Sequence, residues 1–349
     1  MATIDSDAHV VECEETWSFI DGEDKAFTPA LVEVPGGGRS GGSFWVIDGR
    51  LIRTGPVSET DAIKAVREMT DVPARLKQMD EIGTDLQVIY PTVFLRPLTN
   101  RPEVERALCR SYNRWLAGRC AEGEGRLSWA VIPPTMDIEA AIEEVRFGAA
   151  NGAGVVFWRG FEGQSGRLPS DEYFAPLFEE IDRLGLAVGI HAANGTFALH
   201  DIFEGDSGIW RFKVPGIVAF STILASGLPA RYPHIRWGFV ELQAQWVPYV
   251  VADYVRRQSR RGEVIDPASV MRDHHLYVAC QTDDDLEYII RYAGPDNLVA
   301  GTDFGHADTS SELLALQRLR EAAAVEAPLI DRILDDNARA LYGLAPAGR

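Results

Sequence analysis

Short apolar runs rich in β-branched residues recur along the chain and alternate with longer segments whose apolar positions have helical spacing. Runs such as Leu86–Tyr90 and Val155–Trp158 are apolar on both faces, which is typical of parallel strands covered by helices. We expect eight strands, at Thr3–His9, Asp85–Pro91, Leu127–Pro133, Gly154–Trp158, Leu186–His191, Ile235–Glu241, Leu276–Gln281 and Asn297–Asp303.

Segments with helical periodicity separate most of these runs. Asp137 and Asp171 stand where N-caps are expected, and Gly152 and Gly185 stand where helices should end. The expected helices are Pro73–Ile82, Glu103–Ala121, Asp137–Ala150, Asp171–Leu184, Trp246–Gln258, Asp283–Ala293 and Ser310–Ala323, followed by a C-terminal closing helix within Pro328–Leu344.

The alternation of strands and helices predicts an α/β fold. A (β/α)8 TIM barrel is the first choice and a doubly wound open sheet is the alternative. Polar residues end most of the runs, and in a barrel these carboxyl ends converge on one mouth. No G-x-G-x-x-G follows the first run, as a dinucleotide-binding open sheet would have. We therefore predict that residues 1–349 form a single barrel.

The connection over residues 15–72 is too long for an ordinary βα loop. It contains an alternating stretch from Ser43 to Ile52 with Asp48-Gly49 in its middle, which is a strong hairpin signal. We predict an inserted hairpin or cap region over 15–72 that covers the barrel mouth. Residues 193–214, after the fifth strand, are expected to form a lid on the same side.

The charge balance narrows the range of partners. The chain has 34 Lys and Arg against 52 Asp and Glu, a net charge of −18, which argues against nucleic acid and anionic membranes. It has no long apolar stretch, no basic leader and no C-x-x-C pair among its 4 cysteines. We expect a soluble, cytoplasmic protein in which any site for an anion has to be locally basic.

Candidate chemistry lies at three strand ends. Asp7 and His9 are two apart on the first strand and so share a face, His191 ends the fifth strand, and Asp303 ends the eighth. Two imidazoles and two carboxylates at one mouth suit a divalent ion, with Zn²⁺ as the first choice and Mn²⁺ or Fe²⁺ as alternatives.

The chain resembles the amidohydrolase-related (amidohydrolase 2) family of the metal-dependent amidohydrolase superfamily. That family includes aminocarboxymuconate-semialdehyde decarboxylase and γ-resorcylate decarboxylase. The matching motifs are Asp5-Ser6-Asp7-Ala8-His9, Gly189-Ile190-His191, Phe239-Val240-Glu241 before Trp246-Val247-Pro248, Gly301-Thr302-Asp303-Phe304-Gly305-His306, and Asp336-Asn337-Ala338-Arg339-Ala340-Leu341-Tyr342. The resemblance implies a (β/α)8 barrel, a divalent metal held by Asp7, His9, His191 and Asp303, and Asp303 as the base that deprotonates a metal-bound water.

One position departs from the family pattern. Decarboxylases of the family commonly have a histidine where this chain has Glu241, so the resemblance gives less support to decarboxylation. Glu241 could bind a second metal, accept a proton or pair with an arginine. His306, three residues after Asp303, could be a metal ligand or contact the substrate, and with Glu241 it would permit one or two ions.

Several further residues are candidates for binding substrate. Arg159 follows the fourth strand and Arg53 ends the inserted hairpin, so either could hold a carboxylate, although surface arginine is the default interpretation. Trp17 and Trp158 could line an aromatic pocket but are more often core residues. His200 lies in the predicted lid, where a solvated loop histidine is the more ordinary interpretation.

The leading functional hypothesis is a metal-dependent hydrolase of a small organic substrate, with a metal-activated water and Asp303 as base. The second is a non-oxidative decarboxylase of an aromatic or unsaturated acid. The third is a dinuclear oxygenase that uses Glu241 and His306. A barrel that only binds a ligand is the non-enzymatic alternative. A homodimer is the expected assembly, because dimers are common in the family.

Overall fold

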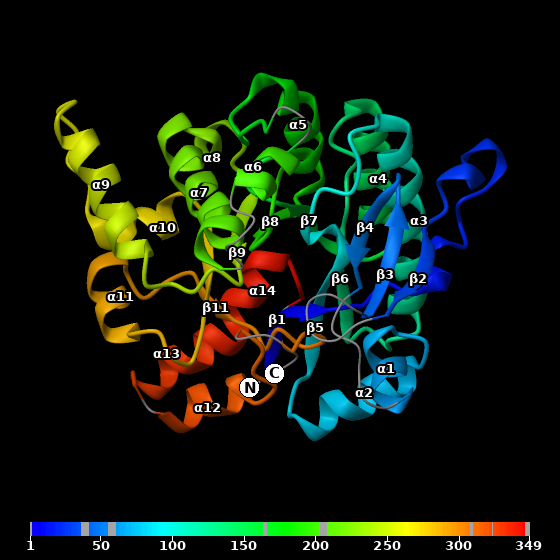
Figure 1. The fold of residues 1–349 in the computed structure, drawn as a ribbon. Helices are drawn as coiled ribbons and strands as arrows, with labels where there is room; N and C mark the ends of the chain where they lie inside the picture. The colour runs from blue at the N-terminus through cyan, green and yellow to red at the C-terminus, as the bar shows by residue number, and fades with distance from the viewer. Residues whose placement is uncertain are drawn as a thin grey trace.

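The computed structural model describes residues 2–35, 42–54, 61–162, 166–202, 208–307, 310–322 and 324–345. Within them lies an 8-stranded parallel sheet whose order follows the chain, with helices on its outside (Figure 1). Its strands are β1 (Ile4–His9), β5 (Leu86–Tyr90), β6 (Leu127–Val131), β7 (Ala153–Trp158), β8 (Ala187–His191), β9 (Arg236–Val240), β10 (Leu276–Cys280) and β11 (Leu298–Ala300).

The first and last strands meet at a seam that nearly closes the sheet into a TIM barrel. The backbone of Asp303 donates from its nitrogen to Asp7 O at 2.8 Å, and His9 donates to Phe304 O at 2.6 Å. An isolated parallel bridge joins Ala8 to Phe304. The predicted barrel is therefore confirmed, with each expected strand overlapping an observed one.

The longer helices connect successive strands and cover the outside of the barrel (Figure 1). Asp137 caps α4 by accepting from Ala140 N at 3.2 Å, and Gly185 ends α5 in the left-handed conformation, as the sequence predicts. The helices are α1 (Asp61–Arg67), α2 (Val72–Glu81), α3 (Pro102–Ala121), α4 (Ile138–Ala150), α5 (Ala175–Leu184), α6 (Phe197–Ile202), α7 (Val214–Ser226), α8 (Leu228–Arg231), α9 (Val247–Ser259), α10 (Val270–Asp273), α11 (Leu286–Ala293), α12 (Ala315–Ala322), α13 (Ala327–Asp331) and α14 (Asn337–Tyr342).

A 3-stranded antiparallel sheet is inserted after β1, consisting of β2 (Ala30–Val34), β3 (Gly42–Ile47) and β4 (Arg50–Arg53). The predicted Asp48-Gly49 turn joins β3 to β4, and both residues have positive φ angles, of 46° and 76°. Asp48 accepts a hydrogen bond from Thr99 at 2.6 Å and so ties this sheet to the loop after β5. The hairpin thus gains a third strand, and the prediction that 15–72 caps the mouth stays a prediction.

The C-terminal segment forms helices that pack against the barrel, as the predicted closing helix requires. Tyr342 of α14 donates its hydroxyl to Ser6 O at 3.0 Å and lies 3.1 Å from the hydroxyl of Tyr90. The tail helix is interrupted, because a π-helical segment, Arg332–Asp336, separates α13 from α14. Where the expected lid begins, α6 follows β8 instead of an open loop.

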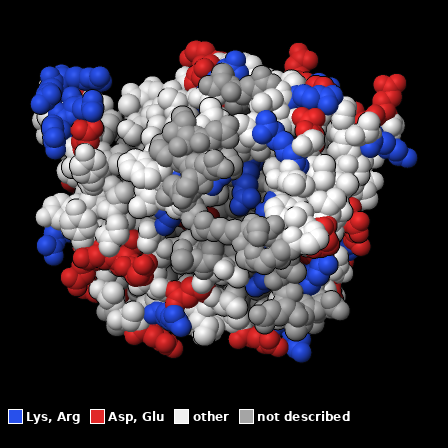
Figure 2. Space-filling view, in the orientation of Figure 1, with Lys and Arg blue, Asp and Glu red and all other residues white. Residues whose placement is uncertain are grey.

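The surface carries the acidic excess unevenly. In Figure 2, red carboxylate side chains lie mostly around the outline of the molecule, whereas blue Lys and Arg side chains lie both around the outline and at the hollow in the centre of this face. Among the described residues, no helix is both long and apolar enough to cross a membrane.

Candidate metal centre

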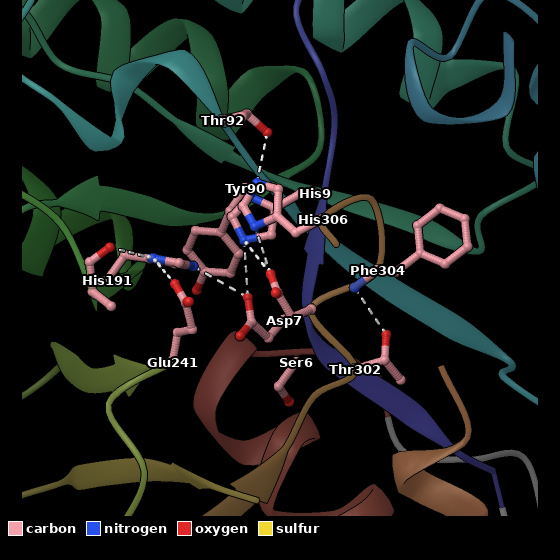
Figure 3. Close-up of polar contacts among 12 residues, drawn as sticks. Ser6, Asp7, His9, Tyr90, Thr92, His191, Glu241, Thr302, Phe304 and His306 are labelled. Carbon is pink, nitrogen blue, oxygen red and sulfur yellow. Dashed lines mark hydrogen bonds and ion pairs between the residues drawn. The ribbon is translucent and has the colours of Figure 1, made fainter. Parts of the chain in front are cut away.

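The predicted ligands at the ends of β1, β8 and β11 come together in a buried cluster (Figure 3). His191 Nε2 lies 3.1 Å from Asp7 Oδ1, and His9 Nε2 lies 3.3 Å from the same oxygen and 3.4 Å from Asp303 Oδ1. Asp7, His9 and His191 form one group of converging ligand atoms, and His9, Asp303 and His306 form another. Because both groups contain His9, the cluster is continuous.

The backbone is strained at two residues in and beside the cluster. Asp303 and Glu241 have φ angles of 52° and 60°, in the left-handed region that side chains other than glycine seldom adopt. Gly301 is required beside Asp7, because a Cβ there would lie 2.2 Å from the Asp7 Cβ. The seam between β1 and β11 is therefore built around the two carboxylates that the metal hypothesis needs.

The proton positions on His9 indicate what the cluster is suited to hold. Its Nδ1 lies 2.9 Å from Pro91 O, which can only accept, so Nδ1 carries the proton. Burial, followed by the nearby His306, lowers the pKa of His9 to about 3, so its ring is neutral. The lone pair on His9 Nε2 then faces Oδ1 of Asp7 and Oδ1 of Asp303. This arrangement is repulsive unless a cation lies between the nitrogen and the two oxygens.

His191 is held in the same manner. Its Nδ1 donates to Ala192 O at 3.1 Å, which leaves Nε2 directed at Asp7. Metal-binding histidines commonly donate their outer nitrogen to a backbone carbonyl, and this bond fixes the tautomer and the ring orientation. Two imidazole nitrogens and two carboxylates in these positions fit a divalent ion.

His306 stacks on His9, with ring centroids 3.8 Å apart, and connects the cluster to Thr92. The Thr92 hydroxyl donates to Val10 O at 2.8 Å, so it accepts from His306 Nε2 at 3.0 Å. Nδ1 of His306 is 2.7 Å from Asp303 Oδ1, a distance that requires a proton or a metal ion between the two atoms. His306 therefore either carries a proton toward Asp303 or serves as a ligand.

Two further buried carboxylates support the cluster from behind. Asp5 accepts from Thr302 N at 2.9 Å and from Thr302 Oγ1 at 2.6 Å, and burial raises its pKa to about 7 against the lowering effect of those bonds. Glu12 accepts from the backbone of Thr92 at 3.1 Å and of Val93 at 2.9 Å, and burial raises its pKa to about 7 as well.

The sequence pattern did not indicate that Asp5, Glu12 or Thr92 belongs to the site. A signal existed for two of them. Asp5 precedes Asp7 by two residues on β1, as Asp7 precedes His9, and Thr92 comes two residues after the end of β5.

Glu241 lies next to the cluster on its outer side. Its Oε2 is 3.5 Å from His191 Nδ1, the nitrogen opposite the one that faces Asp7. Neither converging group of ligand atoms among the described residues includes Glu241. Its role as a metal ligand or catalytic group stays a prediction, and the contact that the structure supplies is with Nδ1 of His191, the nitrogen that faces away from Asp7.

The candidate substrate-binding residues are dispersed. Arg159 pairs with Glu162 at 2.6 Å and lines a cavity of about 220 Å³ between the loops that follow β5, β6, β7 and β8. Trp17 packs at the small sheet, 5.8 Å from Trp45 between ring centroids.

Three other candidates lie in different surroundings. Trp158 packs on Phe174 and Phe178 at the start of α5, with centroid distances of 4.8 and 5.2 Å. Arg53 lies over the Phe44 ring at 5.1 Å, and the side chain of His200 is outside the described residues. The substrate contacts of all five candidates stay predictions.

Comparisons with known proteins agree with the fold and with the motifs. A family model described as Amidohydrolase matches residues 4–344. A search of curated proteins found no match.

Among solved structures, an amidohydrolase from Mycobacterium avium subsp. paratuberculosis is similar, with 20% identity and a TM-score of 0.78 over 99% of this chain and 98% of that one. 5-Carboxyvanillate decarboxylase from Sphingomonas paucimobilis is similar with 16% identity and a TM-score of 0.71, covering 99% of both chains. A dihydroxybenzoic acid decarboxylase from Polaromonas sp. JS666, solved with bound manganese and the inhibitor 2-nitroresorcinol, has 16% identity and a TM-score of 0.67 over 99% of this chain and 98% of that one.

Proposed function

The chain belongs to the Amidohydrolase family, and from that premise we propose that it is a metal-dependent, non-oxidative decarboxylase of a small aromatic or unsaturated acid. The observation that carries the proposal is the buried pair of Asp303 and His306, 2.7 Å apart, beside two further ligand side chains on β1. This is the second of the sequence-based hypotheses. The decarboxylases that share the fold favour it over the hydrolase hypothesis.

We assign Asp7, His9, His191 and Asp303 as the residues that hold one divalent ion. Bound there, the ion would supply a Lewis acid that neutralises the carboxylates and orients an oxygen of the substrate. Mixed nitrogen and oxygen donors suit Mn²⁺ as well as the Zn²⁺ that the sequence suggested, and a decarboxylase of this fold was solved with manganese. Mn²⁺ and Zn²⁺ are therefore the first two ions to test.

Decarboxylation needs a proton at the carbon that loses its carboxylate. The bond between that carbon and the carboxyl group breaks, its electron pair stays on the carbon, and carbon dioxide leaves. In our proposal the Asp303–His306 pair holds the proton that the carbon receives, and Thr92 fixes His306 by accepting from Nε2 at 3.0 Å.

Glu241 has a positioning role in this scheme. Its carboxylate lies 3.5 Å from Nδ1 of His191, beside the bond from that nitrogen to the backbone, and so helps to orient the ring toward Asp7. This assignment explains a carboxylate at a position where the family commonly has histidine, without requiring a second metal.

The test follows carbon dioxide release by the full-length protein loaded with Mn²⁺ or Zn²⁺, using 2,6-dihydroxybenzoate and 5-carboxyvanillate as probes. We expect release of carbon dioxide in step with substrate loss. Asp303→Asn should lower turnover about 10²–10⁴-fold and keep part of the metal, whereas His191→Ala should lose the metal.

His234→Gln is the matched control, because His234 is exposed and pairs with Asp182 outside the cluster. Substrate loss without carbon dioxide would favour hydrolysis. Unchanged turnover in Asp303→Asn would remove the assigned proton carrier.

A further inference from the structure

A buried arginine on α2 contacts the seam between β1 and β11, beside the cluster. Arg75 is fully buried, and its Nη1 donates to the backbone oxygen of His9 at 3.0 Å. Its guanidinium carbon lies 4.6 Å from the centre of the Phe304 ring, which is within the range of a cation–π contact. Because His9 N donates to Phe304 O at 2.6 Å, one guanidinium group contacts both residues of this seam bond.

The contact with Phe304 bears on the ligand carboxylate that precedes it. Phe304 directly follows Asp303, and its ring points away from the side chains of Asp7 and His9 (Figure 3). Asp303 has a φ angle of 52°, and a strained backbone of this kind persists only where the surrounding structure holds it. A contact that fixes Phe304 therefore helps to hold Asp303 in its strained conformation.

A second set of contacts leads from the same guanidinium to the first half of β1. Arg75 Nε donates to Gln87 Oε1 at 2.9 Å, which leaves the Gln87 amide nitrogen to donate to Asp5 Oδ2 at 3.3 Å. Asp5 in turn accepts from Asp7 N at 3.2 Å and from Thr302 N at 2.9 Å. These contacts therefore end on the backbone of one ligand and on the residue that precedes another.

Stability alone is a poor explanation for a charge at this place. Among the described residues no carboxylate pairs with Arg75, and its Nη2 has no hydrogen-bond partner. Burial lowers the pKa of Arg75 to about 10, so the guanidinium keeps its charge at neutral pH. A buried charge that is incompletely paired costs free energy on folding, and an apolar side chain of similar volume is often at least as stable there. An apolar side chain, however, has no donors with which to fix the seam.

We propose that Arg75 is a positioning residue that fixes the backbone of Asp7, His9 and Asp303 through the seam, without touching the ion or the substrate. The planar guanidinium donates in two fixed directions while its face lies over an aromatic ring. A lysine ammonium on its flexible stem cannot hold all of these contacts at once. The proposal rests on the proposed function for the identity of the ligands and does not depend on the reaction.

The first measurement needs no metal. Native-state hydrogen exchange of the metal-free, full-length protein reports the opening of the two seam bonds through the amides of His9 and Asp303. In Arg75→Lys we expect both amides to exchange at least about tenfold faster than in the wild type, beyond any change that the amides of β7 and β8 share.

The second measurement concerns the ion. In competition with a chromophoric chelator, Arg75→Lys should bind Mn²⁺ about 10–100-fold more weakly than the wild type. The visible absorption of bound Co²⁺, which reports the geometry of its ligands, should change as well. Gln87→Met removes only the contacts that lead to Asp5, so it should speed exchange of the Asp303 amide about threefold or more. If Arg75→Lys lacks a cooperative unfolding transition, Gln87→Met decides.

Arg236→Lys is the matched control. Arg236 begins β9 at the end of the barrel opposite the cluster, and its guanidinium also donates to two backbone carbonyls, Leu341 O at 2.7 Å and Gly185 O at 2.6 Å. The control should lower the unfolding temperature, but it should leave Mn²⁺ affinity and the exchange of the His9 and Asp303 amides within about twofold of the wild type.

Seam amides that exchange as in the wild type, or a loss of Mn²⁺ affinity in Arg75→Lys no greater than in the control, would overturn the proposal. A wild-type protein that binds no metal would count against the ligand assignment and so against the proposed function. Hydrogen exchange of the metal-free protein would still decide whether Arg75 holds the seam.

Discussion

The substitution Gly301→Ala tests whether the seam between β1 and β11 holds the proposed metal ligands in place. A Cβ at position 301 would lie 2.2 Å from the Asp7 Cβ, 2.8 Å from the Asp7 nitrogen and 3.0 Å from its Cα, whereas ordinary contact begins at 3.4 Å. Asp7 would have to move by about 1.2 Å, the difference between 3.4 Å and 2.2 Å. These atoms belong to a strand and cannot swing aside as the end of a flexible side chain does.

We expect this overpacking to lower the free energy of unfolding by about 1–3 kcal/mol. The moved Asp7 would also lose its position 3.1 Å from His191 and 3.3 Å from His9, so metal affinity should fall about 10–100-fold. Urea unfolding of the metal-free protein measures the first effect. Competition with a chromophoric chelator for Mn²⁺ measures the second.

Gly118→Ala is the matched control for this prediction. Gly118 lies within α3, and a Cβ there would meet no atom within 4 Å. Alanine is favoured over glycine in a helix, so the control should be neutral or stabilised by up to about 1 kcal/mol, with unchanged metal affinity. A Gly301→Ala protein that is destabilised by less than about 0.5 kcal/mol and binds metal normally would refute the role given to the seam.

Three further predictions follow from the contacts around the cluster. Thr302→Val removes the 2.6 Å bond to Asp5, whose folded pKa of about 7 lies above its ordinary value of 3.8. Between pH 3.8 and about 7 the folded protein therefore holds a proton on Asp5 that the unfolded chain has lost, so the free energy of unfolding falls as pH rises through that interval. The bond from Thr302 stabilises the charged carboxylate more than the neutral one. The variant should therefore lose about 1.5–3 kcal/mol of that free energy at pH 8, but less at pH 5, in urea unfolding. An equal loss at both pH values would contradict the titration of Asp5. Thr92→Val removes the acceptor of His306 Nε2 and should lower kcat about tenfold with little change in KM, measured by initial rates; a normal kcat would argue against the proton arrangement given to His306. Chelation should lower the unfolding temperature and added Mn²⁺ should restore it, because an ion at about 1,000 times its Kd stabilises the folded state by about 4 kcal/mol. A transition that does not respond to chelation would count against a metal at the cluster.

The convergence of the ligands was predictable because it follows from topology. Parallel strands in a barrel direct their carboxyl ends to one mouth, so Asp7, His9, His191 and Asp303 could be brought together from their places at strand ends alone. The hairpin was predictable for a similar reason, since Asp48-Gly49 supplies the two positive φ angles that a tight turn needs.

Other features depend on directions that a one-dimensional pattern does not contain. Val214–Ser226 forms α7, but its apolar residues leave no polar stripe, and Pro215-Gly216 resembles a loop signal. The side of His191 on which Glu241 lies depends on a left-handed backbone conformation. Trp158 ends a strand that is apolar on both faces, so the sequence did not indicate which neighbour it packs on, and the structure places its ring against Phe178 of α5.

The seam also has a consequence for the order in which the barrel assembles. The bonds from Thr302 to Asp5 join residues 297 positions apart, so they close almost the whole chain into one ring. Closing so long a loop costs chain entropy before the contacts between β1 and β11 can form, so we expect this pairing to form late in folding. An ion bound by both Asp7 and Asp303 would crosslink the two ends of that ring. In native-state hydrogen exchange, the amides of β1 and β11 should therefore be the ones whose protection depends most strongly on metal.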